Sequence, residues 1–192
     1  QRTRRSPAWS MRPWATPTSS TKWRRQAFDE GAAVPRMTPN LRRAHVADLD
    51  AIWAVEAQSF DGDRFPKRNL RRLLSSETAE FLIAEGPRGP LGYALVLFRK
   101  GARAARLYSL ATTPGARGRG IGMALVGAAA ACAKRRGSDR LRLEVRASNR
   151  AAIALYARAG FLILKESLSY YGDGETALKM EKRLASPGGK RS

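Results

Sequence analysis

The feature that most constrains the fold is the segment 111–126, ATTPGARGRGIGMALV, in which the loop 117–122, with three glycines and two arginines, separates a strand pattern from a helix pattern. Residues 104–112 alternate and are rich in Leu, Tyr and Thr, which predicts a strand. Residues 121–136 carry apolar side chains at helical spacing, which predicts a helix. A glycine loop before a helix can present unpaired N–H groups and the positive end of the helix dipole to an anion.

Two interpretations of this loop remain open from the residues alone. The first is a site for phosphate or pyrophosphate, in which glycines at 118, 120 and 122 let the backbone approach the ligand. The second is a flexible turn before a helix. The loop lacks the Gly-Lys-Ser/Thr of a P-loop, and Leu125 breaks the G-x-G-x-x-G spacing of dinucleotide-binding folds.

The remaining patterns predict a single mixed α/β domain. Strands are expected over 41–44, 80–85, 91–99, 141–145, 161–168 and 176–182. Helices are expected over 48–58 with Asp48 as its cap, over 67–74 and over 149–159. This order gives a hairpin-rich first half followed by β-α-β-α-β.

The 192 residues carry a net charge of +20. Residues 1–36 hold 8 Lys/Arg and 2 Asp/Glu, and residues 37–184 hold 26 and 14, so the globular part is itself basic at +12. We expect a disordered basic segment over 1–36, the domain over 37–184 and a disordered tail over 185–192. The first segment fits an organellar targeting peptide or an over-extended start before Met37, and we favour the latter.

Cysteine and histidine usage excludes several classes of site. Cys132 is the only cysteine, which excludes an internal disulfide and, on the apolar side of a helix, predicts a core residue. His45 is the only histidine and is expected at the surface, so we expect no metal site. The longest mostly apolar stretch, 121–133, is shorter than the ~20 residues of a membrane span. These observations favour a cytoplasmic protein without a membrane partner.

Two stretches resemble the GNAT superfamily of N-acetyltransferases. The loop residues Arg117-Gly-Arg-Gly-Ile-Gly122 are similar to that superfamily's Arg/Gln-x-x-Gly-x-Gly/Ala signature. The stretch LRLEVRASNRAAIALYARAGF over 141–161, and YYGDGETALKMEK from Tyr170, resemble bacterial ribosomal-protein-alanine N-acetyltransferases. The resemblance covers 41–184 and implies a central, mostly antiparallel sheet of about seven strands with a splayed central strand pair, flanked by about four helices.

The resemblance also implies roles for individual residues. Acetyl-coenzyme A would be the cosubstrate, with Glu144 as general base and Tyr156 as general acid. Asn149 would contact the coenzyme. The other residues implied to bind it are backbone groups of the strand and of the loop: Leu110, Ala111, Thr112, Arg117, Gly118, Arg119, Gly120, Ile121, Gly122 and Met123.

The chemistry agrees with these roles, although simpler interpretations of both catalytic candidates stay open. An amine must lose a proton before it attacks a thioester, and a carboxylate can take it directly or through one water. A tyrosine hydroxyl can protonate the departing thiolate. Glu144 shares one strand face with Arg142 and Arg146, which also fits a solvated strand with ion pairs. Tyr156 could instead pack in the core.

The implied activity is acetyl transfer to an amine, with a protein N-terminal α-amine, of the ribosomal-protein-alanine type, as the leading acceptor. A lysine side chain or a small amine is the alternative within the enzymes. A non-catalytic basic module that binds nucleic acid or the ribosome is the alternative outside them. Three departures from the family concern the acceptor: Thr113 before Pro114, Thr176 in the closing hairpin, and the unusually basic segment 61–74.

Overall fold

The computed structural model describes residues 38–59 and 65–184. The predicted disordered segments 1–36 and 185–192 lie outside the described residues. The described elements are β1 (Asn40–Arg43), the 3-10 turn η1 (Val46–Asp48), α1 (Leu49–Ser59), α2 (Lys67–Leu74), β2 (Ala79–Gly86), β3 (Gly89–Leu97), β4 (Ala104–Thr112), the 3-10 turn η2 (Pro114–Ala116), α3 (Ile121–Arg135), β5 (Arg140–Arg146), α4 (Arg150–Arg158), β6 (Leu162–Ser167) and β7 (Ala177–Arg183).

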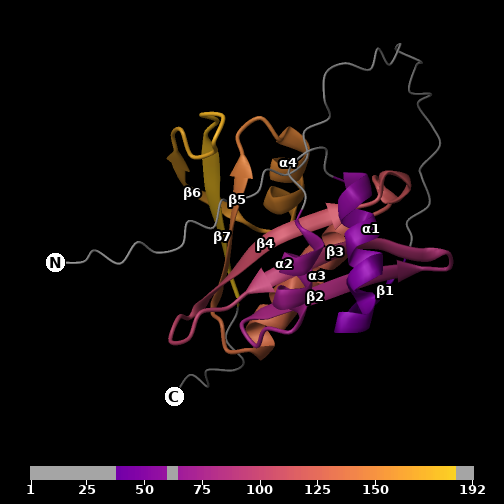
Figure 1. Ribbon diagram of the computed structural model, residues 1–192. Coiled ribbons are helices and arrows are strands. Elements are labelled where there is room, and N and C mark those ends of the chain that lie inside the picture. The colour runs from indigo at the N-terminus through magenta and orange to yellow at the C-terminus, as the bar shows by residue number, and fades with distance from the viewer. Residues whose placement is uncertain (1–37, 60–64, 185–192) are drawn as a thin grey trace, which may run out of the picture.

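The described strands form one seven-stranded sheet in the order β1-β2-β3-β4-β5-β7-β6. All neighbouring pairs are antiparallel except β4 and β5, which run parallel. The helix α3 connects these two parallel strands, as a parallel crossover requires. The predicted mixed fold with a mostly antiparallel sheet is therefore confirmed (Figure 1).

Helices cover both faces of the sheet, and each face has its own apolar cluster. On one face, α1 and α2 bury residues such as Ile52 and Leu70 against β2 and β3. On the other face, α3 and α4 bury residues such as Leu125 and Tyr156 against β3, β4 and β5. Figure 1 shows the first helix pair in front of the sheet and the second pair behind it.

Most element boundaries follow the sequence pattern, and one predicted cap was wrong. The predicted elements over 67–74 and 104–112 coincide with α2 and β4. Asp48, predicted as the cap of the first helix, instead ends the 3-10 turn η1, and α1 begins at Leu49. The Asp48 carboxylate accepts the His45 N–H at 2.7 Å, so it caps the turn and not the helix.

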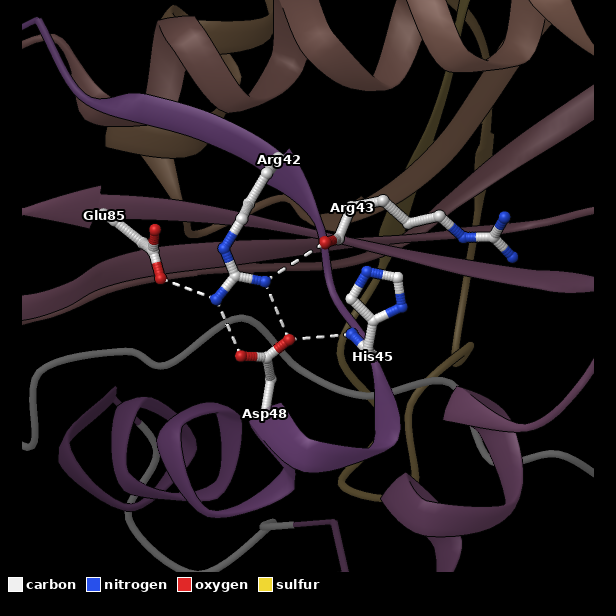
Figure 2. A network of polar contacts seen from close by, with 5 residues as sticks. All are labelled: Arg42, Arg43, His45, Asp48 and Glu85. Carbon is white, nitrogen blue, oxygen red and sulfur yellow. Dashed lines mark hydrogen bonds and ion pairs between the residues drawn. The ribbon is translucent and has the colours of Figure 1, made fainter.

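An ion-pair network fixes Asp48 in that position (Figure 2). The Arg42 guanidinium donates to both carboxylate oxygens of Asp48 at 2.7 and 2.8 Å, and to Glu85 Oε1 at 2.6 Å. The hydrogen bonds from Arg42 lower the pKa of Asp48 to about 2. The network joins β1, η1 and β2, and it includes a pairing between residues far apart in sequence that local periodicity does not predict.

The single cysteine and the single histidine lie where the sequence predicts, in the core and at the surface. Cys132 is fully buried on α3, and burial raises the pKa of its thiol to about 12. His45 is exposed before η1. Within residues 38–59 and 65–184, no group of three or more His, Cys, Asp or Glu side chains could hold a metal ion. No helix in the same ranges is long and apolar enough to cross a membrane.

Candidate active site

The centre of the sheet is open between β4 and β5. These parallel strands pair only at their beginnings, from Ala104 opposite Arg140 to Arg106 opposite Arg142. Beyond that point each strand keeps only its outer partner, because β4 continues along β3 and β5 continues along β7. A strand split of this kind leaves backbone groups of β4 directed toward a gap in the ladder, where β5 no longer pairs with them.

The alternation of antiparallel hydrogen bonds decides which backbone groups of β4 face the gap. The Thr113 N–H donates to Leu91 O at 2.9 Å, so Ala111, two residues earlier and opposite Tyr93, also directs its backbone toward β3. Leu110 and Thr112 consequently direct theirs toward the gap. Of the three residues predicted to bind through this strand, the geometry thus favours Leu110 and Thr112 over Ala111.

The gap is bordered by the end of α1. The Ser59 hydroxyl donates to the Thr112 carbonyl at 3.2 Å, on the side of β4 that faces away from β3. The fully buried Glu56, one turn earlier, accepts the Phe65 N–H at 2.8 Å and the Tyr93 hydroxyl. These contacts hold the start of α2 against the same side of the sheet. The helical spacing of Glu56 with Leu49 and Ile52 was the sequence signal for its place on the buried side of α1.

The glycine loop ends in an open cradle at the start of α3. Gly118 and Gly120 have φ values of +75° and +86°, a left-handed backbone that favours glycine. Apart from the adjacent residues of the loop, no described atom lies within 4 Å of a Cβ built on either residue. Gly120 is the N-cap of α3, and no side chain caps the first N–H groups of the helix. The first helical hydrogen bond runs from the Ala124 N–H to the Gly120 carbonyl.

This cradle fits a phosphate group. The N–H groups of the first three residues of α3, Ile121, Gly122 and Met123, precede that first helical bond and point out of the helix end. Gly122 has a second role, because a Cβ there would lie 3.1 Å from Leu155 Cδ2 of α4, closer than an ordinary packing contact. Arg117 is exposed and Arg119 half-buried beside the cradle, which adds positive charge.

Asn149 lies at the start of α4, and only the oxygen of its side-chain amide has a hydrogen-bond partner among the described residues. Its Oδ1 accepts the Ala152 N–H at 3.0 Å and caps the helix. Its side chain is buried, and in the described part of the chain Nδ2 has no hydrogen-bond partner. A buried donor without a partner costs free energy unless a ligand or water satisfies it, so this amide fits a ligand contact.

The loop before Asn149 is held by charged groups of the β6–β7 connection. Arg146, at the end of β5, donates to Asp173 at 2.7 Å and to Glu175, and its guanidinium lies 4.1 Å from the Tyr171 ring centroid. Glu175 in turn accepts the Ser148 N–H at 3.1 Å. The position of Asn149 is therefore fixed from both sides.

Glu144 lies on β5 just beyond the last residue paired with β4. Leu143 and Val145 face the cluster under α3 and α4, so by alternation Glu144 faces the side of α1 and α2. Its Oε2 accepts from both Nε and Nη2 of Arg106 at 2.8 Å, and the Arg106 guanidinium carbon lies 5.2 Å from the Tyr108 ring centroid. The carboxylate is thus oriented at the edge of the gap.

Tyr156 belongs to α4, on the opposite side of the sheet from Glu144. It is 5% exposed and its ring contacts Phe161, with centroids 5.7 Å apart. Burial raises the pKa of its hydroxyl above the ordinary value, which keeps the hydroxyl protonated. The two catalytic candidates consequently lie on opposite faces of the sheet and are not neighbours on one surface.

Tyr170 is a further polar group on the Glu144 side that sequence reasoning did not single out. Burial, followed by the Glu144 charge, raises its pKa to about 12, and Lys179 Nζ lies 5.3 Å from its ring centroid. The Tyr-Tyr pair in the closing hairpin was the available signal, but its position beside Glu144 depends on the pairing of β5 with β7.

Comparison with known proteins finds relatives among the acetyltransferases. The family model for the acetyltransferase (GNAT) family matches residues 46–161. A Bacillus subtilis protein named "Putative ribosomal protein bS18-alanine N-acetyltransferase" is 30% identical over 141 residues, which cover 73% of this chain and 92% of the relative. Mycothiol acetyltransferase of Salinispora arenicola is 36% identical over 135 residues, which cover 64% of this chain and 44% of the relative.

Solved structures agree with this comparison. The ribosomal-protein-S18-alanine N-acetyltransferase from Escherichia coli has a TM-score of 0.70 at 26% identity, covering 81% of this chain and 99% of that one. A Salmonella typhimurium acetyltransferase structure with its cofactor acetyl-CoA has a TM-score of 0.67 at 18% identity, covering 81% and 99%. At 18% identity, the likeness to the Salmonella typhimurium structure shows a shared fold alone.

Proposed function

The chain belongs to the GNAT family of acetyltransferases, and from that premise we propose that it transfers an acetyl group from acetyl-coenzyme A to a protein N-terminal α-amine. The observation that carries the proposal is the gap between β4 and β5, which has Glu144 on one side of the sheet and Tyr156 on the other. A base and an acid so separated suit a reaction in which an amine enters from one face and a thiol leaves at the other.

The cofactor side is the face of α3 and α4. The open cradle of Gly118 and Gly120, with the first N–H groups of α3, suits the pyrophosphate of coenzyme A. The unsatisfied Nδ2 of Asn149 supports a hydrogen bond to the same molecule. When bound, acetyl-coenzyme A supplies an acetyl group activated as a thioester.

Each step of the transfer has a residue suited to it. Glu144, oriented by Arg106, takes a proton from the incoming amine directly or through one water. The Leu110 N–H, directed toward the gap, donates to the acetyl oxygen as negative charge develops there. Tyr156, kept protonated by burial, gives its proton to the departing sulfur. No step requires a covalent bond between the acetyl group and the protein.

The acceptor is assigned from the relatives. Two of them, in Bacillus subtilis and Escherichia coli, carry names that specify the alanine of a ribosomal protein. An α-amine, with a pKa of ~8, is also easier to deprotonate than a lysine at ~10.4. A small-molecule amine is the second candidate, because mycothiol acetyltransferase is a relative at 36% identity; the chain spans less than half of its length.

A panel of acceptors tests the assignment. Purified protein and acetyl-coenzyme A are incubated with a peptide that begins with a free alanine, with the same peptide blocked at its N-terminus and carrying an internal lysine, and with small amines. Mass spectrometry measures the acetylated products. We expect the free-alanine peptide to be acetylated at its α-amine and the blocked peptide to react at least tenfold more slowly. Faster acetylation of the lysine peptide or of a small amine would overturn the assignment.

A further inference from the structure

The helix α2 carries a concentration of positive charge that the fold does not require. Its sequence is KRNLRRLL, and it buries Leu70 and Leu73 while it exposes four cations. These are Lys67, Arg68, Arg71 and Arg72. The helix has no acidic residue in its first turn, where Lys67 and Arg68 lie instead. Cations at the positive end of a helix dipole destabilise the helix, so folding alone does not explain them.

The spacing of these cations suits an extended polyanion. Residues 67 and 71, and residues 68 and 72, are one helical turn apart, so the charges form two rows with a repeat of about 6 Å. That repeat is close to the distance between successive phosphates of an extended single strand. Residues 37–184 carry a net charge of +12, which favours encounter with a polyanion.

An exposed aromatic side chain lies beside the rows. Trp53, on α1, is 39% exposed, and the Lys67 Nζ lies 5.7 Å from its ring centroid. Lys67 also pairs with Asp50 of α1, which fixes the start of α2 beside Trp53. Basic side chains next to an accessible indole are the elements with which proteins bind single-stranded nucleic acid, through phosphate contacts and base stacking.

The location links this surface to the gap. Phe65, two residues before the start of α2, packs on Tyr108 with ring centroids 5.9 Å apart, and the Arg106 guanidinium that orients Glu144 lies over the Tyr108 ring. The helix α2 therefore lies on the Glu144 side of the sheet, beside α1 (Figure 1).

We propose that Trp53 and the exposed cations of α2 form a surface that binds single-stranded RNA, so that the protein can hold an acceptor that is presented in a ribonucleoprotein. The binding surface stands on α1 and α2 alone. RNA binding itself does not depend on the acetyl transfer proposed above, since neither the cradle nor Glu144 and Tyr156 belong to this surface; its use in holding an acceptor rests on that proposed function.

The test measures binding of a short, unstructured, labelled RNA by fluorescence anisotropy over a series of salt concentrations. The full chain is compared with Arg68→Gln/Arg71→Gln, which removes two charges from the surface, and with Trp53→Leu, which removes the stacking ring. The matched control is Arg88→Gln/Lys100→Gln, which removes two exposed charges from the β2–β3 and β3–β4 turns. Acetylation of a free-alanine peptide by each variant is measured in parallel.

We expect the parent to bind RNA with an affinity that falls as salt rises. The Arg68→Gln/Arg71→Gln variant should lower the slope of log affinity against log salt by about 1.4, and the control should leave it nearly unchanged. Trp53→Leu should weaken binding by about fivefold or more. Peptide acetylation should be the same in all four proteins.

Three results would overturn the proposal. They are no binding by the parent at low salt, an equal loss in the control pair, and stronger binding of an acidic peptide than of RNA by the same surface. If peptide acetylation fails in the parent while RNA binding behaves as expected, the proposed acceptor is wrong and the RNA surface stands.

Discussion

Replacing Asn149 with alanine removes two groups whose contributions to stability have opposite signs. The Oδ1 atom caps α4, and loss of such a cap costs about 1 kcal/mol. The Nδ2 atom has no partner among the described residues, and removal of a buried, unsatisfied donor returns about 1 kcal/mol or more. The free energy of unfolding of the ligand-free protein should therefore change by less than about 1 kcal/mol, or about 4 °C in Tm at this chain length.

Asn149→Ala should have a larger effect on the affinity for coenzyme A than on the stability of the ligand-free protein. The hydrogen bond from Nδ2 to the ligand is then lost, which should weaken affinity by about two- to tenfold. Calorimetric titration with coenzyme A gives the affinity, and thermal unfolding with and without the ligand gives the two stabilities. Asn149→Ser is the control for the cap, because its hydroxyl still accepts the Ala152 N–H; it should keep the ligand-free Tm and lose affinity.

Either of two outcomes would refute this reasoning. A loss of more than about 3 kcal/mol in the ligand-free Asn149→Ala protein would mean that the amide is fully used in the fold. An unchanged affinity for coenzyme A would mean that its free N–H group does not face the ligand.

Other changes test the loop, the core and the ion-pair network. Gly120→Val should no longer bind coenzyme A, because valine is strained at the φ of +86° that the loop adopts and adds a side chain to the open cradle; thermal unfolding should show that the variant stays folded, and Gly127→Val, on the exposed side of α3, should bind normally in the same calorimetric titration. Cys132 should react with a thiol reagent only after unfolding in urea, because it is buried and its pKa is raised to about 12; labelling of the native protein would contradict that burial. Asp48 has a folded-state pKa of about 2, below its ordinary 3.8, so its stabilising contribution is complete above pH 3.8 and is lost as the pH falls toward 2. Urea unfolding across this pH window should show that the free energy of unfolding of the parent falls by up to about 2 kcal/mol, and by less in Asp48→Asn. The exposure of Arg42 reduces the size of this effect. An equal pH dependence of the two proteins would exclude the Arg42–Asp48 network as its cause.

The parts of the fold that the sequence predicts are those in which neighbouring residues carry the signal. The change from alternating to helical spacing around the glycine loop predicted β4 and α3, and the apolar pair in KRNLRRLL predicted α2 to the residue. The 3-10 turn η1 was not predicted, because its stabilising partner Arg42 is bonded also to Glu85, 43 residues away. A bond of that kind leaves no local pattern.

The site was predictable only in part, for a related reason. The resemblance to a family supplied Glu144, Tyr156 and Asn149, and their roles stay predictions until they are tested. Their surroundings depend on contacts across the sheet: Arg106 reaches Glu144 only where β4 and β5 begin to separate. The free N–H group of Asn149 and the closeness of Trp53 to Lys67 likewise follow from packing between elements, which periodicity does not contain.

The most direct test of acetyl transfer through the gap is the initial rate for a free-alanine peptide, saturating in both substrates, as a function of pH in Glu144→Gln. Glutamine keeps the shape of the side chain and cannot take a proton. The rate at pH 7 should fall by about 10²–10⁴-fold, and the loss should shrink as the pH passes the amine's own pKa of ~8. Binding of acetyl-coenzyme A should be unchanged. A rate at pH 7 equal to that of the parent would contradict the account and leave Glu144 as an ion-pair partner of Arg106 on an ordinary strand face.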